Sequence, residues 1–300
     1  MAETTYTRPI VRQGVPPVGH IAAQSLVNLS LALWAVMVIF PMVWLLYSSF
    51  KTDQEIFFDP WALPKSPQLD NFERAWDEVH VGQYFLNSIR VVVPSLALTL
   101  ALAAMTSYIL ARFRFPGNRL LFYLFLSGLL FPIFMALVPL FFLVRDLGNN
   151  ISPHIGLNSF LGLILVYVAY SLPFTIFFLT SFFKTLPSEL HEAALIDGAN
   201  EYQVFFRVML PLAQPGLITM GIFNFLGMWD QFVLPLVLMS DPKHYLLPQG
   251  LSYMLHQQYY MNDWSGLFAA VTIIMIPTLV VYVIFQSKIQ KGITVGALKG

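Results

Sequence analysis

The chain has 300 residues, of which 57% are hydrophobic and only 11% are charged, and its sixteen basic and sixteen acidic residues cancel to no net charge. This composition excludes an ordinary soluble domain, in which about 25% of residues are charged, and predicts a membrane protein. The chain has no cysteine, which excludes disulfides, thiolate zinc sites and cysteine catalysis.

Six apolar runs are long enough to cross about 30 Å of hydrocarbon as helices of about 20 residues each. Every run contains at least one proline, which favours kinked helices packed around a path over a simple anchor. The sequence therefore predicts an all-α, polytopic membrane protein whose six transmembrane helices cover residues 25–48, 86–111, 120–144, 158–181, 215–239 and 266–286.

Lysine and arginine are distributed unequally among the segments between these runs. Successive segments lie on alternating sides of the membrane. The segments on the side of both termini hold ten lysine and arginine residues, those on the other side hold five, and Arg90 lies near the mouth of the second run. Because cytoplasmic loops retain positive charge, both termini are predicted to be cytoplasmic. The predicted organisation is a cytoplasmic tail (1–24), a membrane domain (25–287) with an external loop at about 51–85 and a cytoplasmic loop at about 182–214, and a cytoplasmic tail (288–300).

The external loop carries three prolines, seven acidic residues and a short predicted helix near its end. Two interpretations stay open for this helix. It either lies in the interface with its aromatic side chains at the level of the lipid headgroups, or it forms a surface that docks an external protein.

Several chemical motifs are missing. No Gly-Lys pair occurs, so the chain has no phosphate-cradling loop for ATP. The pair His191 and Glu192 begins like a zinc-protease helix, but the position of the second histidine is Leu195. We therefore predict neither a catalytic residue nor a metal site.

Asp230 is the conspicuous ionisable residue within the apolar runs, and a carboxylate in that position marks a functional path by default. Trp229 offers an aromatic face on which a sugar ring stacks, and Asn224 offers a further hydrogen-bonding group. The three residues are candidates for a substrate path. Adjacent helix residues point about 100° apart, however, so Trp229 and Asp230 cannot both face one narrow pore. The alternative is an interfacial tryptophan beside a carboxylate capped by neighbouring helices.

The cytoplasmic loop carries the signals of two short helices and a turn. Pro187 suits the start of the first helix, and Gly198 is a natural terminator. Asn200 then begins a second helix with Gln203 as its capping partner, and Pro211 is expected to stop it. Four carboxylates, on Glu189, Glu192, Asp197 and Glu201, predict a docking surface for another protein. The alternative is an ordinary amphipathic hairpin at the membrane interface.

The stretch "EAALIDGANEYQVFFRVMLP" resembles the cytoplasmic signature of binding-protein-dependent ABC importer permeases. The residues that carry the resemblance are Glu192, Ala193, Ala194, Gly198, Leu210 and Pro211. "ARFRFPGNR", "LPFTIFFLTSFF" and "GITVGALKG" extend it over nearly the whole chain and are similar to the carbohydrate-uptake branch, in particular to the shorter permease subunit of the maltose system. The resemblance implies the type I importer permease fold and assigns the signature residues to coupling with an ATPase.

The resemblance also implies partners. They are a second, non-identical permease, a cytoplasmic ATPase dimer that binds ATP and Mg²⁺, and an extracytoplasmic sugar-binding protein. The chain itself then needs no cofactor and performs no chemistry, and it contacts lipid but no nucleic acid. Lys299 and Gly300 resemble a tail that contacts the ATPase, and the location implied is the bacterial or archaeal cytoplasmic membrane. A permease for glycerol phosphate or a peptide, and an ion-coupled secondary carrier, are the alternatives.

Overall fold

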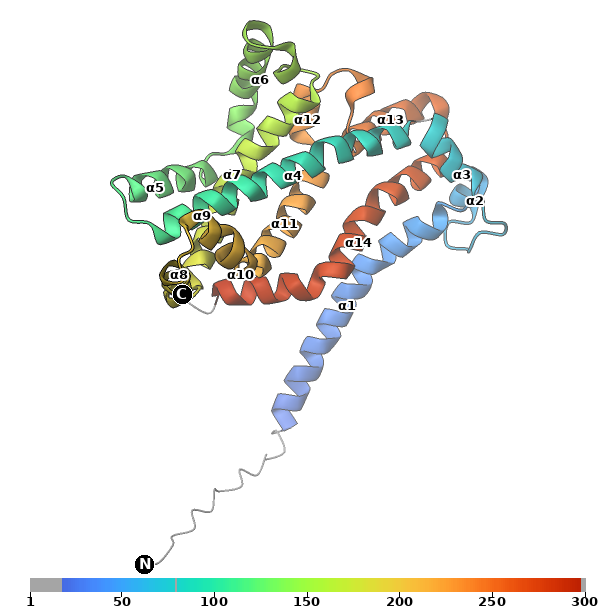
Figure 1. The fold of residues 1–300 in the computed structure, drawn as a ribbon. Coiled ribbons are helices and arrows are strands. Elements are labelled where there is room, and N and C mark those ends of the chain that lie inside the picture. The colour runs from blue at the N-terminus through green and yellow to red at the C-terminus, as the bar shows by residue number, and fades with distance from the viewer. Residues whose placement is uncertain (1–17, 79, 298–300) are drawn as a thin grey trace, which may run out of the picture.

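The computed structural model describes residues 18–78 and 80–297, and every regular element within them is a helix (Figure 1). The long helices are α1 (Val18–Ser48), α4 (Val81–Arg112), α6 (Ile133–Asn150), α7 (Phe160–Thr185) and α14 (Trp264–Ala297). The shorter ones are α2 (Asp53–Phe58), α3 (Asp70–Glu73), η1 (Arg74–Glu78), α5 (Asn118–Leu129), η2 (Pro153–Ile155), α11 (Gln214–Trp229), α12 (Val233–Leu238), η4 (Pro242–His244) and α13 (Leu247–Met261). The predicted all-α membrane fold is confirmed.

Five helices in the described part of the chain are long and apolar enough to cross a membrane. A sixth crossing results only if two segments that meet at an angle of 70°, Glu201–Leu212 and Gln214–Trp229, are counted as one span. The predicted spans 25–48, 86–111 and 158–181 correspond closely to α1, α4 and α7.

The predicted third span, residues 120–144, is wrong as a single helix. α5 ends at Leu129, and α6 begins at Ile133 after Pro132, whose backbone is extended with ψ of 119°. Proline has no amide hydrogen to donate and its ring clashes with the preceding turn, so the helix is interrupted at this point. α6 alone has the length of a span, and the crossing therefore lies further along the chain than predicted.

The predicted fifth span, residues 215–239, is also broken. α11 starts with Pro215 in its first turn, where the missing amide has little effect, and it ends at Trp229. The side chain of Gln231 then accepts a hydrogen bond from the amide of Val233, which starts α12. The run after Trp229 is thus a separate short helix.

The predicted sixth span, residues 266–286, lies inside the longer helix α14. The backbone of α14 stays helical through Ala297. The predicted tail at 288–300 therefore begins as a continuation of the last helix.

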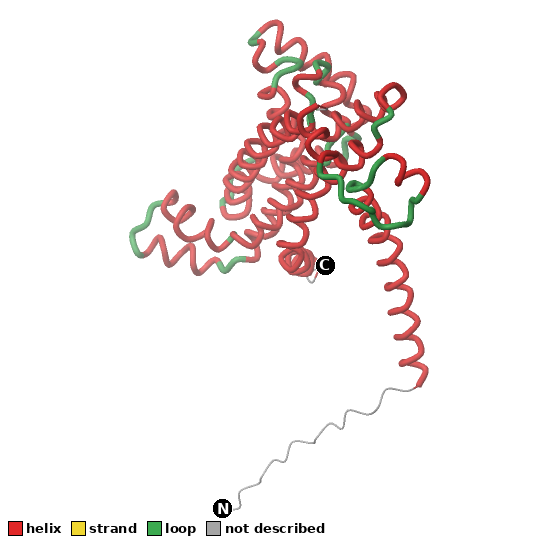
Figure 2. The backbone as a smooth tube through the Cα atoms, turned by 90° about the vertical axis from the view of Figure 1, so that its right-hand side faces the viewer, coloured by secondary structure: helices red, strands yellow, loops and turns green. Residues whose placement is uncertain are grey.

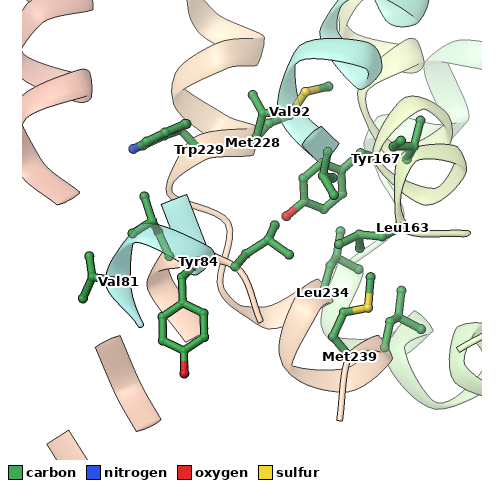
Figure 3. Packing of buried hydrophobic residues seen from close by; sticks show 14 of the residues in the cluster. Val81, Tyr84, Val92, Leu163, Tyr167, Met228, Trp229, Leu234 and Met239 are labelled. Carbon is green, nitrogen blue, oxygen red and sulfur yellow. The ribbon is translucent and has the colours of Figure 1, made fainter. Parts of the chain in front are cut away.

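The core is built around α4 and α7, which run side by side in the same direction (Figure 1). Figure 2 shows the same helical fold turned by 90°. Near the start of both helices, Val92, Leu163 and Tyr167 belong to one buried cluster, part of which Figure 3 shows. Near their ends, Tyr108 and Phe183 belong to a second buried cluster. The C-terminal ends of α4 and α7 therefore meet at the same end of the molecule.

α1 stands largely apart from this core (Figure 1). Its apolar side chains are exposed on all sides, with Trp34 at 66% and Met37 at 70% exposure. It approaches α14 near its C-terminal end, where the rings of Trp44 and Phe268 meet edge to face at 5.4 Å. An apolar surface of this extent is covered by lipid or by another chain.

The segment between α1 and α4, which the sequence predicts to be external, is held by a buried lysine. The Lys51 ammonium donates hydrogen bonds of 3.0 Å to the carbonyls of Asp59 and Pro60 and lies 4.9 Å from the centre of the Tyr47 ring. Burial lowers the pKa of Lys51, against the opposing effect of nearby carboxylates. A second link joins Arg74 to Asp263, close to the start of α14, at 3.2 Å. Both contacts fix the segment to the ends of the membrane helices.

Candidate functional site

Four short helical segments connect α7 to α11 and lie beside the C-terminal end of α4 in Figure 1. They are α8 (Ser188–Ile196), α9 (Glu201–Val204), the π-helical turn η3 (Phe205–Met209) and α10 (Leu210–Leu212). We refer to residues 186–212 as the two-helix loop, because α9, η3 and α10 follow one another without a break.

The turn within the two-helix loop forms as the sequence predicts. Gly198 has a φ of +87°, a left-handed conformation that glycine adopts without strain, and it follows the last turn of α8. The Asn200 side chain accepts a hydrogen bond from the amide of Gln203, and the Gln203 side chain accepts one from the amide of Asn200, both at 2.9 Å. The predicted glycine turn and capping box are confirmed.

The prediction that Pro211 stops the second helix is wrong. Pro211 lies in the first turn of α10, which continues η3 to Leu212, and the chain changes direction at Ala213. The helix from Glu201 to Leu212 is continuous here, so Pro211 has no amide hydrogen to donate to the preceding turn. The π-helical turn η3 directly precedes Pro211. Its hydrogen bonds span five residues instead of four, and it lies where the backbone donor of residue 211 is missing.

The first helix of the loop presents its side chains outward. α8 has no buried residue, Glu192 and Ala193 are exposed, and Ala194 is half-buried. Ile196 is 86% exposed, and Tyr202 beyond the turn is 79% exposed. Large apolar side chains at this exposure, next to small alanines and a free carboxylate, are typical of a surface that another protein covers.

The second helix of the loop is anchored in the core instead. Val204, Phe205 and Met209 are buried in the cluster that contains Tyr108 of α4 and Phe183 of α7. The rings of Phe205 and Tyr108 lie 5.0 Å apart. The two-helix loop therefore has one exposed helix and one helix that moves together with the membrane helices.

A polar contact joins both halves of the loop to α4. One oxygen of Glu201 lies 3.2 Å from Nε2 of His191 in α8 and accepts a hydrogen bond of 3.3 Å from the Tyr108 hydroxyl. We call these three residues the clamp. Sequence reasoning placed Glu201 on the docking surface, but it is half-buried and faces α4. A contact between residues this distant in the sequence leaves no local signal.

Arg112, the last residue of α4, makes a second link. Its guanidinium donates hydrogen bonds to the carbonyls of Phe183 at 3.0 Å and Leu186 at 2.7 Å. These carbonyls lie at the end of α7, where helical carbonyls have no intrahelical partner. The ends of α4 and α7 are thus bound together at the point from which the two-helix loop leaves.

A cavity of about 380 Å³ lies between α5, α7 and α11 and contains a mixture of aromatic and neutral polar side chains. Asn224 lines it and donates a hydrogen bond of 2.9 Å to the Thr175 hydroxyl. Tyr170 and Gln231 contribute further polar groups, and no acidic or basic residue is among those that line the cavity. Its size lies in the range of small-molecule sites.

The other two residues of the predicted path lie elsewhere. Trp229 is 3% exposed, stacks on Phe225 at 5.5 Å and meets the edge of Phe85 at 5.6 Å. Its indole is directed away from Tyr167, a residue of the cavity wall (Figure 3). Asp230 is exposed and accepts a long hydrogen bond of 3.4 Å from Thr278 of α14. The structure thus brings Asn224 alone to the cavity, and a role for Trp229 and Asp230 in the path stays a prediction.

Lys299 and Gly300, the predicted tail contact, lie outside the described residues. Within the described ranges, no group of three or more histidine, aspartate and glutamate side chains is arranged to hold a metal ion.

Comparisons with known proteins agree on one family. The model of the binding-protein-dependent transport system inner membrane component matches residues 97–295. The diacetylchitobiose uptake system permease protein NgcG of Streptomyces coelicolor is 48% identical over 269 residues, which cover 90% of this chain and 87% of that protein. The sulfoquinovosyl glycerol transport system permease protein SmoH of Agrobacterium fabrum is 36% identical, covering 87% and 89% respectively.

Among solved structures, a chain of a bacterial ABC transporter involved in the import of the acidic polysaccharide alginate matches with a TM-score of 0.77. The match covers 91% of this chain and 98% of that chain at 19% sequence identity. A likeness at this identity concerns the fold alone.

Proposed function

This chain belongs to the family of binding-protein-dependent transport system inner membrane components, and we propose that it is a permease subunit of an ATP-driven importer of a neutral oligosaccharide. It is a multi-pass component of the inner membrane and a transport subunit rather than an enzyme. The family assignment removes the ion-coupled carrier from the alternatives. In this proposal both termini are cytoplasmic, as the distribution of lysine and arginine indicates.

The observation that carries the coupling role is the division of the two-helix loop. α8 has no buried residue, whereas Phe205 and Met209 are buried against α4 and α7. Force applied to α8 by a docked ATPase reaches the membrane helices through these buried residues and through the clamp. Closure of the ATPase dimer would then reorient the helices and alternate access to the path. Glu192, Ala193, Ala194, Gly198, Leu210 and Pro211 belong to this docking element.

The 380 Å³ cavity supports a sugar as the solute. Sugars bind through aromatic faces and neutral hydrogen-bonding groups, and the cavity offers Tyr170, Asn224 and Gln231. An anionic solute such as glycerol phosphate favours fixed positive charge, which the lining lacks. The 48% identical relative is named for the uptake of diacetylchitobiose, a neutral disaccharide, and we propose a solute of that class.

The proposal assigns the remaining parts of the importer to other chains. Membership of this family implies an extracytoplasmic binding protein and an ATPase, and the ATPase would hold ATP and Mg²⁺. A second, non-identical permease would complete the path. The apolar surfaces of α1 and α6 that this chain leaves exposed are available to lipid and to that permease.

Replacing Gly198 tests the coupling role. A β-carbon at Gly198 meets no atom within 4 Å, so a substitution acts through its positive φ alone, at a cost of about 1–2 kcal/mol. We expect Gly198→Val, in the purified complex with its ATPase, to abolish hydrolysis stimulated by the binding protein and to stop sugar uptake, while basal hydrolysis persists.

Thermal unfolding provides the control for backbone strain. The melting temperature of the Gly198→Val complex shows how much activity is lost through reduced stability alone. Unchanged stimulation and unchanged uptake in Gly198→Val would refute the coupling role.

A further inference from the structure

An apolar stripe on α4 leads to the end of the helix that carries the clamp. Leu98, Leu102, Met105 and Ile109 follow one another at helical spacing, and each is between 40% and 46% exposed. Their common face points away from the core around α4 and α7. The stripe runs within the membrane-spanning part of α4 and ends in the last turns of the helix.

A groove continues this stripe beyond the membrane-spanning turns. It has a volume of about 630 Å³ and is lined by Met105 and Ile109 of α4, by Phe113 and Phe115 of the following turn, and by Phe205 of the two-helix loop. The walls are almost entirely apolar. Arg114 stands at the rim of the groove.

A basic pocket of about 780 Å³ adjoins the groove on the other side of Arg114. It is lined by Arg114, Arg119 and Asn118, and both arginine side chains are exposed. Neither arginine forms an ion pair with any residue that the structure describes. Asn118 donates to the carbonyls of Leu110 and Phe113 and thereby fixes the turn between the arginines.

We propose that this site binds an anionic phospholipid of the cytoplasmic leaflet. The phosphate of the headgroup would pair with Arg114 and Arg119, and one acyl chain would occupy the groove and follow the stripe on α4. Two unpaired guanidinium groups complement a phosphate diester, and the apolar groove complements the chain attached to it. The site faces the leaflet in which the basic loops of the chain are placed.

The bound lipid touches the coupling machinery. Glu201, which links His191 to Tyr108, lines the same groove. An acyl chain there packs against Phe205 and restricts how far the two-helix loop moves from α4. The site therefore provides a way for the lipid composition of the membrane to act on transport.

Native mass spectrometry of the complete, delipidated transporter tests the proposal. Phosphatidylglycerol, phosphatidylcholine and inorganic phosphate are titrated separately. We expect the wild-type complex to prefer phosphatidylglycerol, and Arg114→Gln combined with Arg119→Gln to weaken that binding about thirty-fold, since each basic residue near a membrane surface contributes about fivefold. Arg145→Gln serves as the matched control, because Arg145 is exposed but pairs with Asp146 on α6, away from the site.

A second variant separates the contribution of the acyl chain to binding from that of the headgroup. Ile109→Trp fills the groove and leaves both arginines in place, so we expect it to weaken phosphatidylglycerol binding as well. Equal binding of the two lipids, or unchanged binding in the double variant, would overturn the proposal. If inorganic phosphate binds as tightly as phosphatidylglycerol, and Ile109→Trp does not change its binding, the site binds free anions and not a lipid. If the double variant loses the ATPase from the complex but still binds lipid, the two arginines contact the ATPase and not a lipid.

Discussion

Removal of the Glu201 carboxylate should loosen the two-helix loop from α4. One carboxylate oxygen lies 3.2 Å from Nε2 of His191 and 3.3 Å from the Tyr108 hydroxyl. Tyr108 is 4% exposed and belongs to the buried cluster, so α4 provides a fixed attachment point. Glu201→Ala removes both contacts, whereas Tyr108→Phe removes one and keeps the ring packed against Phe205.

The expected magnitude follows from the exposure of the pair. Hydrogen bonds to charged groups contribute about 1.5–3 kcal/mol when they are buried. The Glu201 side chain is 44% exposed, and screening by solvent reduces its contribution to about 1 kcal/mol. A loss of about 1 kcal/mol lowers the equilibrium constant for holding the loop in the coupled position about fivefold.

Transport and hydrolysis measured together in proteoliposomes check this reasoning. Glu201→Ala should lower the amount of sugar imported per ATP hydrolysed, by at most about fivefold. Glu73→Ala, which removes an exposed carboxylate from the external segment, gives the baseline. Adding Tyr108→Phe to Glu201→Ala should change nothing further, because the hydroxyl has already lost its partner. Strictly additive losses, or an unchanged ratio in Glu201→Ala, would refute a clamp that acts as one unit.

Three further predictions concern other parts of the molecule. Lys51→Met removes the hydrogen bonds that the buried ammonium donates to the carbonyls of Asp59 and Pro60, at a cost of about 1–3 kcal/mol, so the melting temperature of the complex should fall; an unchanged value contradicts this. Burial raises the pKa of Asp263, but hydrogen bonds from the Gly266 amide and Arg74 outweigh it and hold the pKa below its ordinary value. The ionised carboxylate therefore stabilises the segment above the ordinary carboxyl pKa, and this stability is lost as the pH falls through the lower folded value. Proteolysis of the external segment should rise on acidification, and an equal rise in Asp263→Asn would show that another group is responsible. Asn224→Leu removes a neutral polar group from the cavity and a donor to the buried Thr175 hydroxyl, so sugar uptake should fall while nucleotide binding by the ATPase stays normal; wild-type uptake would exclude Asn224 from the path.

The two-helix loop shows how far local sequence signals reach. Gly198 and Asn200 act on residues within four positions of themselves, and the structure forms the turn and the capping box that they predict. The membrane class likewise follows from composition alone, because apolar content is a property of each segment. These features depend on neighbours along the chain, and the sequence displays those neighbours directly.

The breaks in the helices depend on more than local signals. Pro94, Pro173 and Pro277 lie inside continuous helices, whereas Pro132 lies in the break between α5 and α6. Every apolar run contains a proline, and whether the helix continues past it depends on what packs around the freed carbonyl. The sequence showed the prolines but not which of them interrupts a span.

The clamp and the cavity were decided by tertiary structure. Glu201 meets Tyr108 because α4 and α7 run in parallel and end together. Asn224 reaches the cavity while Trp229 turns into the core because the two residues lie about 140° apart around α11. Each contact joins residues from separate helices, and its free energy depends on how those helices pack. Composition and local spacing determined that this chain is a helical membrane protein with an exposed, capped loop. Only the packing of α4, α7 and α11 decided which side chains meet, because a contact across the fold has no counterpart in the order of neighbouring residues.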